Sequence, residues 1–336
     1  IDMKELVFKN KKTCFSLSSP EDSVKHHVGE YFQVVEHWTN QYSLYYKGVE
    51  NNKDVVKLAM AGADFEFVSP GVADAPKVVV TDCPGGSFSI IKKDDCLYML
   101  CGSNISTGED RDADIPDLVW NETKKRSYPD HHRKDRKNGL YLLKSKNGMN
   151  WEEVHSLPVL HCFLHGNGVP FGSVGYDTRP STIKISDQYF FYSRLNPSLD
   201  ERAVFFTTST DLFGWSSPTR IHITNEPVVD GKNNYYNLVV FPFGDKICAF
   251  APYFEACGTE QRQTKNGKTL FLVSDNGFDW EIKGYAFPHN GRYDKRVNSV
   301  IEKDDKFLVF FRENLLECGS SISSYELEKE DIREIL

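Results

Sequence analysis

Pairs of short apolar runs, separated by two to four residues, recur along the whole chain. In one pair, residues 181–185 (Ser-Thr-Ile-Lys-Ile) and 188–193 (Gln-Tyr-Phe-Phe-Tyr-Ser) flank Ser186-Asp187. β-Branched and aromatic residues bounded by turn-forming residues are typical of β-hairpins. The other predicted pairs are 87–91 with 96–100, 236–241 with 246–251 and 297–301 with 306–311, and the run 42–46 closes the first unit.

A seven-residue turn that ends in tryptophan follows the third run of three units. The copies are Ser145-Lys-Asn-Gly-Met-Asn-Trp151, Ser209-Thr-Asp-Leu-Phe-Gly-Trp215 and Ser274-Asp-Asn-Gly-Phe-Asp-Trp280. Their tryptophans lie 64 and 65 residues apart, and a degenerate copy ends at Phe65. A fixed period indicates stacked supersecondary repeats. The Ser and Asp or Asn side chains can hydrogen-bond the turn backbone while the indole packs over the hairpin, so we expect a structural role for these tryptophan turns.

Four strands per unit and five units predict an all-β fold, a five-bladed β-propeller with four antiparallel strands per blade. We expect residues 1–336 to form it as a single domain. Residues 323–327 are predicted to supply the third strand of the last blade, and residues 4–8 to complete its outer edge and close the ring. The second blade carries a polar insertion at 102–138, which is expected to overhang the face opposite the tryptophan turns.

Composition narrows the classes of partner. The net charge of −8 argues against nucleic acid as a ligand, and the basic residues between 124 and 137 are interleaved with Asp and His, as in a solvated loop. No run of 18 apolar residues occurs, so we expect no membrane span. The oligomeric state is not predicted by the sequence.

The eight cysteines have no metal-ligand spacing, and Cys96 and Cys248 fall in apolar strands, where free cysteines act as small core residues. This pattern favours reduced thiols in an intracellular setting over a disulfide framework, with secretion as the alternative. The acidic run 110–114 lacks the Gly and the downstream Glu of a calcium loop. We therefore predict no metal and no cofactor.

Residues 176–181 (Tyr-Asp-Thr-Arg-Pro-Ser), 189–194 (Tyr-Phe-Phe-Tyr-Ser-Arg) and 202–218 resemble the central blade of five-bladed glycoside hydrolases of families thirty-two and forty-three. The layout is similar from about residue 42 to residue 312, and the tryptophan turns resemble a shortened form of the Asp-box of sialidases. The resemblance implies a propeller that acts on, or binds, carbohydrate. The family thirty-two motifs Trp-Met-Asn-Asp-Pro-Asn-Gly, Arg-Asp-Pro and Glu-Cys-Pro are absent, which puts the catalytic residues in doubt.

The starts of the innermost strands and the ends of the second strands open on one face of a propeller, around its axis. Carboxylates expected at these positions are the catalytic candidates Asp177, Glu255, Asp82, Glu313 and Asp294. The substrate-binding candidates at the same positions are Arg179, Arg194, Tyr236, Arg296 and Arg312. The first blade offers Glu30 and Glu36, and Tyr253 is a further aromatic that could stack on a sugar. The alternative for each residue is a structural role, such as a hydrogen bond at a junction between blades.

Glycoside hydrolysis needs one carboxylic acid to protonate the leaving oxygen and a second carboxylate to activate water or attack carbon. The sequence thus favours a glycosidase (an O-glycosyl hydrolase) that cleaves a glycosidic bond in an oligosaccharide or glycan. Asp177, kept ionised by Arg179, is the predicted base, and Glu255 or Glu313 the predicted acid. One alternative is a non-catalytic propeller that binds carbohydrate or protein on the same face. Another is a sialidase-like enzyme, which requires an arginine cluster from Arg179, Arg194, Arg296 and Arg312.

Overall fold

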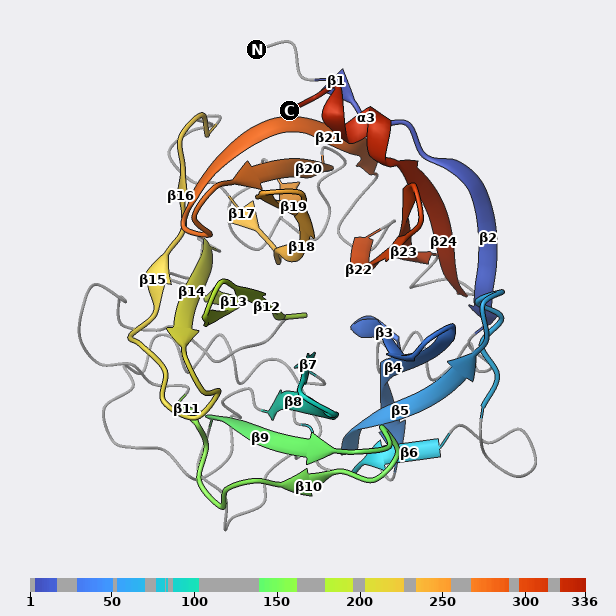
Figure 1. Cartoon of the computed structure of the whole chain (residues 1–336), viewed down its shortest axis with the longest axis vertical. Coiled ribbons are helices and arrows are strands. Elements are labelled where there is room, and N and C mark those ends of the chain that lie inside the picture. Colours follow the sequence, from blue (N-terminus) through green and yellow to red (C-terminus); the bar gives the residue numbers. More distant parts are fainter. Residues whose placement is uncertain are drawn as a thin grey trace, which may run out of the picture.

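The computed structural model describes residues 4–16, 29–50, 53–69, 77–81, 83, 87–102, 139–161, 179–195, 203–226, 234–254, 267–289, 296–313 and 321–336. Within these residues the chain forms 24 β-strands and one short helix, α3 (Lys329–Arg333). The strands are arranged as sheets around a central axis, which is the architecture of a β-propeller (Figure 1). The predicted all-β class and the propeller arrangement are confirmed.

The described strands form five sheets, numbered 1 to 5 here in chain order. Sheet 1 contains β3 (Phe32–Trp38), β4 (Gln41–Glu50), β5 (Lys53–Ala61) and β6 (Lys77–Val80). Sheet 2 contains β7 (Phe88–Lys93), β8 (Cys96–Gly102), β9 (Gly139–Ser145), β10 (Glu152–Glu153) and β11 (Leu160–His161). Sheet 3 contains β12 (Ser181–Ile185), β13 (Gln188–Leu195), β14 (Ala203–Ser209) and β15 (Thr219–Arg220).

Sheets 4 and 5 complete the ring and receive the N-terminal strands. Sheet 4 contains β17 (Asn234–Tyr235), β18 (Val239–Phe243), β19 (Lys246–Phe254), β20 (Gly267–Ser274) and β21 (Asp279–His289), with β1 (Lys4–Glu5) and β16 (His222–Ile223) parallel to β21. Sheet 5 contains β22 (Arg296–Lys303), β23 (Lys306–Glu313), β24 (Ser321–Glu328) and β2 (Lys9–Ser16). The predicted hairpins are therefore confirmed, including the strand at 323–327. Strand β3 was not among the predicted strands.

The innermost strands form a closed ring. Neighbouring strands in the order β3, β7, β12, β18, β22 and back to β3 lie in contact around the centre of Figure 1. Side chains hydrogen-bond across four of the five junctions. The hydroxyl of Ser181 accepts from the Val240 N–H at 3.4 Å, and the hydroxyl of Ser299 accepts from the Val34 N–H at 3.1 Å. The other two contacts are Gln33 with the backbone of Ile90, and Thr182 with Ser89.

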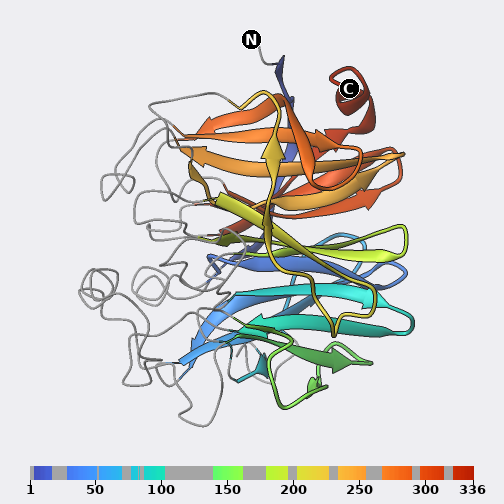
Figure 2. The ribbon, with the colours of Figure 1, turned by 90° about the vertical axis from the view of Figure 1, so that its left-hand side faces the viewer.

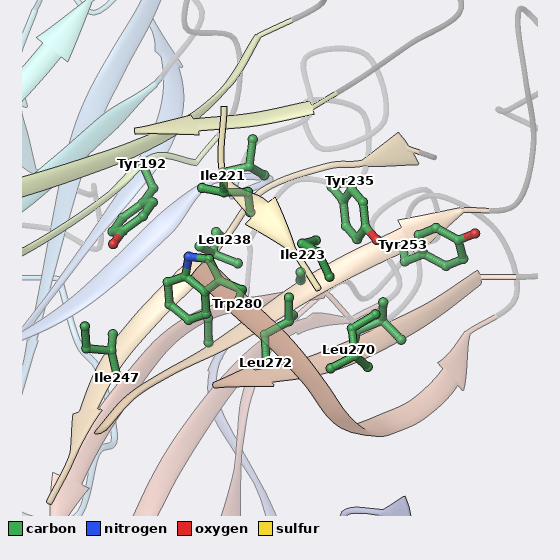
Figure 3. Close-up of a cluster of buried hydrophobic side chains, with 14 of the residues drawn as sticks. Tyr192, Ile221, Ile223, Tyr235, Leu238, Ile247, Tyr253, Leu270, Leu272 and Trp280 are labelled. Carbon is green, nitrogen blue, oxygen red and sulfur yellow. The ribbon is translucent and has the colours of Figure 1, made fainter. Parts of the chain in front are cut away.

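The apolar faces of neighbouring sheets pack together in five separate clusters, one between each adjacent pair. Figure 3 shows the cluster between sheets 3 and 4, where Tyr192 and Trp280 lie close to Leu272 and Ile247. The indole of Trp280 is completely buried and meets the ring of Tyr192 edge-on at 5.9 Å. Burial of apolar area, at roughly 25 cal/mol per Å², drives this packing, so each sheet gains stability from the contact with both of its neighbours.

The N-terminal strands pair with the sheets in a different way from the one that the sequence predicted. Residues 4–8 were expected to complete the last blade, and this is wrong: β2 (Lys9–Ser16) pairs with β24 instead. Leu6 is buried in the cluster between sheets 4 and 5, and its N–H donates to the Tyr285 carbonyl of sheet 4 at 2.8 Å. That burial holds the first residues on the preceding sheet. The ammonium of Lys4 also donates to the Glu334 carbonyl at 3.0 Å, near the C-terminus (Figure 1).

The three tryptophan turns occupy the same position in sheets 2, 3 and 4, after the third strand, and share one hydrogen-bond network. The serine hydroxyl accepts from the N–H three residues later at 2.9 Å in every copy. The Asn or Asp oxygen accepts from two further N–H groups at 2.8 to 3.0 Å. The indole N–H donates to the carbonyl three residues earlier at 2.9 to 3.1 Å. These contacts all lie within the turn and are structural.

The carbonyl that accepts the indole belongs to a residue with a positive φ: 69° at Gly148, 78° at Leu212 and 85° at Gly277. Glycine adopts this conformation without strain, whereas Leu212 requires support from its surroundings. Leu212 is fully buried in the cluster between sheets 2 and 3, which supplies that support. Figure 2 shows that the strands run roughly along the axis of the ring, so each turn lies at one end of its sheet.

Candidate functional site

The predicted site residues divide into two groups. Arg179, Arg194, Tyr236, Arg296, Arg312 and Glu313 lie within the described residues. Asp82, Asp177, Glu255 and Asp294, together with the insertion after residue 102, lie outside them. The described part of the candidate site therefore consists of the arginines, Tyr236 and the carboxylates of Glu30 and Glu313.

Two pairs of arginines occupy matching positions in sheets 3 and 5. Arg296 and Arg312 are direct partners across β22 and β23. In sheet 3, Ser181 of β12 is opposite Tyr192 of β13. Arg179 lies two residues before Ser181 and Arg194 two residues after Tyr192, so this register also places the two arginines opposite each other. All four side chains are buried, with exposed fractions between 1% and 5%. A buried guanidinium group lowers the stability of the folded state unless hydrogen bonds or an opposite charge compensate for the loss of water. Four such groups lie at the strand ends around one axis, which is more typical of a functional site than of a core.

Arg179 reaches across the centre of the ring. Its Nε donates to the Phe32 carbonyl of sheet 1 at 3.0 Å, although sheets 1 and 3 are not neighbours. Its Nη1 donates to the Ser181 hydroxyl at 3.2 Å and to the carbonyl of Pro180. Burial lowers the pKa of Arg179 to about 9, which leaves the group charged at neutral pH. The side chain therefore places a fixed positive charge beside the axis.

Tyr236 lies between arginines of the two flanking sheets. The guanidinium of Arg194, from sheet 3, lies 4.6 Å from the centre of the Tyr236 ring. The guanidinium of Arg296, from sheet 5, lies 5.7 Å from the same centre. Both distances are within the range of cation–π attraction. The N–H of Tyr236 donates to the Pro252 carbonyl at 3.0 Å, which holds the residue at the start of the inner strand of sheet 4.

Glu30 supplies a carboxylate to this group. It lies two residues before β3, and its Oε1 accepts from Arg296 Nη2 at 2.8 Å, with both side chains buried. Arg312 Nη1 donates to the Glu313 carbonyl at 2.8 Å. The pKa of Arg312 is lowered to about 9, mainly by burial; nearby Glu30 raises it and Arg296 lowers it. We call Glu30, Arg179, Arg194, Tyr236, Arg296 and Arg312 the axial cluster.

The carboxylate of Glu313 lies over the outer strands of sheet 5 rather than over the inner strand. It accepts hydrogen bonds from the hydroxyls of Ser323 at 2.8 Å and Tyr325 at 2.7 Å, and Lys11 Nζ lies 2.7 Å away. Burial alone would raise the pKa of Glu313, but the hydrogen bonds from Lys11, Tyr325 and Ser323 outweigh it and lower the pKa. A lowered pKa keeps the carboxylate ionised, which suits an ion pair and is opposite to the need of a general acid.

Two other residues suggested by the sequence do not join the cluster. Glu36 is exposed at the far end of β3, roughly 20 Å along the strand from Glu30, and it accepts from the Asn40 N–H in the following turn at 3.3 Å. Tyr253 is buried in the core between sheets 3 and 4, with its ring 5.3 Å from that of Tyr235 (Figure 3). We therefore assign turn capping to Glu36 and core packing to Tyr253.

The contact between Arg179 and the Phe32 carbonyl was not predicted, because β3 was not recognised as an inner strand. The sequence holds a signal for strand β3. Residues 32–35 are mainly apolar, and they are followed by Asn40, a residue type that commonly adopts a positive φ in turns; here its φ is 60° in the turn before β4.

Among the described residues, no group of three or more His, Cys, Asp or Glu side chains could hold a metal ion. Across the same part of the chain, no helix has the length and apolar character needed to span a membrane.

No protein-family model matches the sequence, and no curated protein matches it. Solved structures match over nearly the whole chain. The GH32 β-fructofuranosidase BmSUC1 of Bombyx mori superposes with a TM-score of 0.56 at 15% identity, covering 94% of this chain and 63% of that chain, so the present chain spans less than two thirds of that enzyme. An N-acetylgalactosamine deacetylase from F. plautii, solved with blood group B trisaccharide, gives 0.59 at 12% identity, covering 97% of each chain.

A β-xylosidase, RS223, gives a TM-score of 0.54 at 10% identity and covers 95% of each chain. The resemblance in layout to propeller glycoside hydrolases, inferred from the sequence, is confirmed. At these identities the likeness shows the β-propeller fold alone, because one fold carries many activities.

Proposed function

We propose that the protein is a glycan-processing propeller, a glycosidase that cleaves a glycosidic bond at the axial cluster. The observation that carries this proposal is the convergence of four buried guanidinium groups, one buried carboxylate and Tyr236 where the inner strands begin. Charges in a protein interior cost free energy that apolar residues would not. Such groups gather at functional sites more often than elsewhere.

We further propose that each of the five sheets is one blade of a single propeller domain over residues 1–336. The closed ring of five inner strands and the five apolar clusters between neighbouring sheets support this count. In such a ring the inner strands of all blades surround the axis, and the axial cluster, with residues from sheets 1, 3, 4 and 5, lies where a ligand site would be expected.

The carboxylate pair is proposed from residues next to a cluster arginine in sequence or next to a strand end. Asp177 lies two residues before Arg179, Asp294 lies two before Arg296, Glu255 directly follows β19, and Asp82 precedes Cys83. An arginine within about 4–6 Å lowers the pKa of a carboxyl group. Asp177 would then serve as the base or nucleophile and Glu255 as the acid, with Asp82 and Asp294 as further candidates. Glu313 is the weaker candidate because its pKa is lowered.

The test is a screen of aryl-glycosides and natural glycans with the wild-type protein and Asp177→Asn. Loss of a catalytic carboxylate is expected to reduce turnover by a factor of about 10² to 10⁴, with the melting temperature changed by no more than a few degrees. The matched control is Glu36→Gln, which alters an exposed carboxylate outside the cluster and should leave turnover unchanged. An active Asp177→Asn enzyme would contradict the assignment.

A second candidate, a sialidase-like enzyme for acidic sugars, is favoured by the charge of the axial cluster. Its described members carry four guanidinium groups and one carboxylate. Arginine binds a carboxylate through two parallel hydrogen bonds, a geometry that lysine lacks. Turnover of acidic glycans that Arg194→Lys abolishes, with neutral glycans inert, would select this candidate. Tight glycan or protein binding without turnover of any substrate would instead select the non-catalytic propeller.

A further inference from the structure

Cys83, in the segment before sheet 2, and Cys101, in strand β8 of sheet 2, lie in closer contact than two unbonded sulfur atoms should. The Sγ atoms of Cys83 and Cys101 are 2.6 Å apart. Even two carbon atoms in contact rest at about 3.5–4.0 Å, whereas a disulfide bond is about 2.05 Å long. Both side chains are buried, with exposed fractions of 0% and 2%. The two thiols thus face each other inside the protein, and the distance between their sulfur atoms is longer than a disulfide bond but shorter than a van der Waals contact.

The positions of the two residues suit a cross-link. Cys101 lies in β8, opposite Phe88 of β7, and Cys83 lies five residues before Phe88 in the segment that enters β7. The N–H of Cys83 donates to the Asp54 carbonyl of sheet 1 at 3.3 Å. Both cysteines belong to the apolar cluster between sheets 1 and 2. The backbone is therefore held on both sides of the pair by strand pairing and by apolar packing.

We propose that Cys83 and Cys101 form an intrachain disulfide bond when the protein folds in contact with a disulfide oxidant such as oxidised glutathione. This revises the expectation from the sequence that the thiols remain reduced. It does not depend on the proposed function, because it rests on the sulfur contact and its burial.

The step balances as two thiol–disulfide exchanges. One cysteine loses its proton and its thiolate attacks a sulfur of the oxidant, which forms a mixed disulfide and releases one thiol. The second thiolate attacks the protein sulfur of that mixed disulfide. The bond between Cys83 and Cys101 forms, and the second thiol of the oxidant leaves. Two protons and two electrons pass from the protein to the oxidant.

The bond would join two segments that lead to the candidate site. Cys83 directly follows Asp82, a candidate catalytic carboxylate, and Cys101 directly precedes the insertion that begins at residue 102. A cross-link at this point fixes the entry to the inner strand β7 and the exit of β8 against each other. The closed loop from residue 83 to residue 101 also restricts the unfolded chain, which stabilises the folded state.

The test uses the full chain, unfolded in urea and refolded with oxidised and reduced glutathione. The protein is alkylated without reduction, cleaved with trypsin and analysed by mass spectrometry. We expect a linked peptide that contains Cys83 and Cys101 and is two hydrogen atoms lighter than the sum of its parts. Trypsin leaves Cys96 and Cys101 in one peptide, so fragmentation between Tyr98 and Met99 has to place the link on Cys101. Full alkylation of both residues, or a link to Cys96, would overturn the proposal.

A stability measurement gives an independent readout. Protein refolded with glutathione should melt several degrees above protein refolded with dithiothreitol. The matched control is Cys248→Ala, which removes a cysteine that is as deeply buried and whose pKa burial raises to about 12. This variant should keep the dependence on reductant, and Cys101→Ala should lose it. If Cys101→Ala does not fold, the peptide map of the wild-type protein decides alone.

Discussion

The guanidinium of Arg296 lies 2.8 Å from the carboxylate of Glu30, and both side chains are buried. Arg296 begins the inner strand of sheet 5, and Glu30 comes just before the inner strand of sheet 1. The pair therefore joins the last sheet of the chain to the first, beside the apolar contacts and the Ser299 hydrogen bond between the same two sheets. It also places a carboxylate next to the arginines of the axial cluster.

Glu30→Gln should lower the free energy of unfolding by about 3 kcal/mol, because it removes the negative charge beside a buried guanidinium. Urea denaturation measures this change. The control is Glu281→Gln, whose partner Lys283 is 2.8 Å away in a pair that is substantially exposed. Exposed pairs contribute about 0–1 kcal/mol, so the control should unfold almost like the wild type. Equal losses of unfolding free energy in both variants would mean that the buried pair stabilises the fold no more than an exposed pair does.

Asp211→Ala should destabilise the protein by about 1 kcal/mol, the usual contribution of a side chain that caps backbone N–H groups. The Asp211 carboxylate accepts from the N–H groups of Phe213 at 2.8 Å and Gly214 at 3.0 Å. Asp211→Asn should be far milder, because Asn147 and Asn276 make the same contacts in the equivalent turns. Thermal melting of the two variants tests this, and similar losses for both would show that the charge matters more than the acceptor.

Tyr192→Phe should cost about 1 kcal/mol. The Tyr192 hydroxyl of sheet 3 donates to the Gly277 carbonyl in the tryptophan turn of sheet 4 at 2.6 Å. Tyr45 of sheet 1 makes the equivalent contact with Gly148 in the turn of sheet 2 at 2.9 Å. Because the two contacts share no partner, the losses in Tyr45→Phe and Tyr192→Phe should add in the double variant. Denaturant titration of the three variants tests the repeat, and a strongly non-additive result would contradict independent junctions.

Glu313→Gln should lower stability at neutral pH without abolishing turnover. The lowered pKa of Glu313 means that its ionised form stabilises the folded state above the ordinary value of 4.5, and that this contribution is lost as the pH falls through the folded pKa. The stability difference between wild type and variant should therefore shrink on acidification from pH 7 to pH 3. Loss of turnover in a folded Glu313→Gln variant would restore Glu313 as the catalytic acid.

The sequence by itself determined the local structure of this protein. The hydrogen bonds inside each tryptophan turn join residues no more than three apart, so the Ser, Asn or Asp and Trp residues are enough to predict the turn from the sequence. The same holds for the hairpin turns, where Ser186 and Gly244 adopt a positive φ. The constant spacing of the turns then indicated repeated sheets and a propeller.

The tertiary structure alone decided which charged side chains meet. The sequence named Glu30, Glu36 and Glu313 as possible site carboxylates, yet of these three only Glu30 pairs with an arginine of the axial cluster, because strand direction and the face of each sheet set where a carboxylate points. The pairing of the N-terminal strands was also decided by the tertiary structure. Leu6 is held by the apolar cluster between sheets 4 and 5 and by its hydrogen bond to Tyr285, and not by its neighbours in sequence. Both outcomes depend on contacts between residues hundreds of positions apart, and no local pattern encodes them.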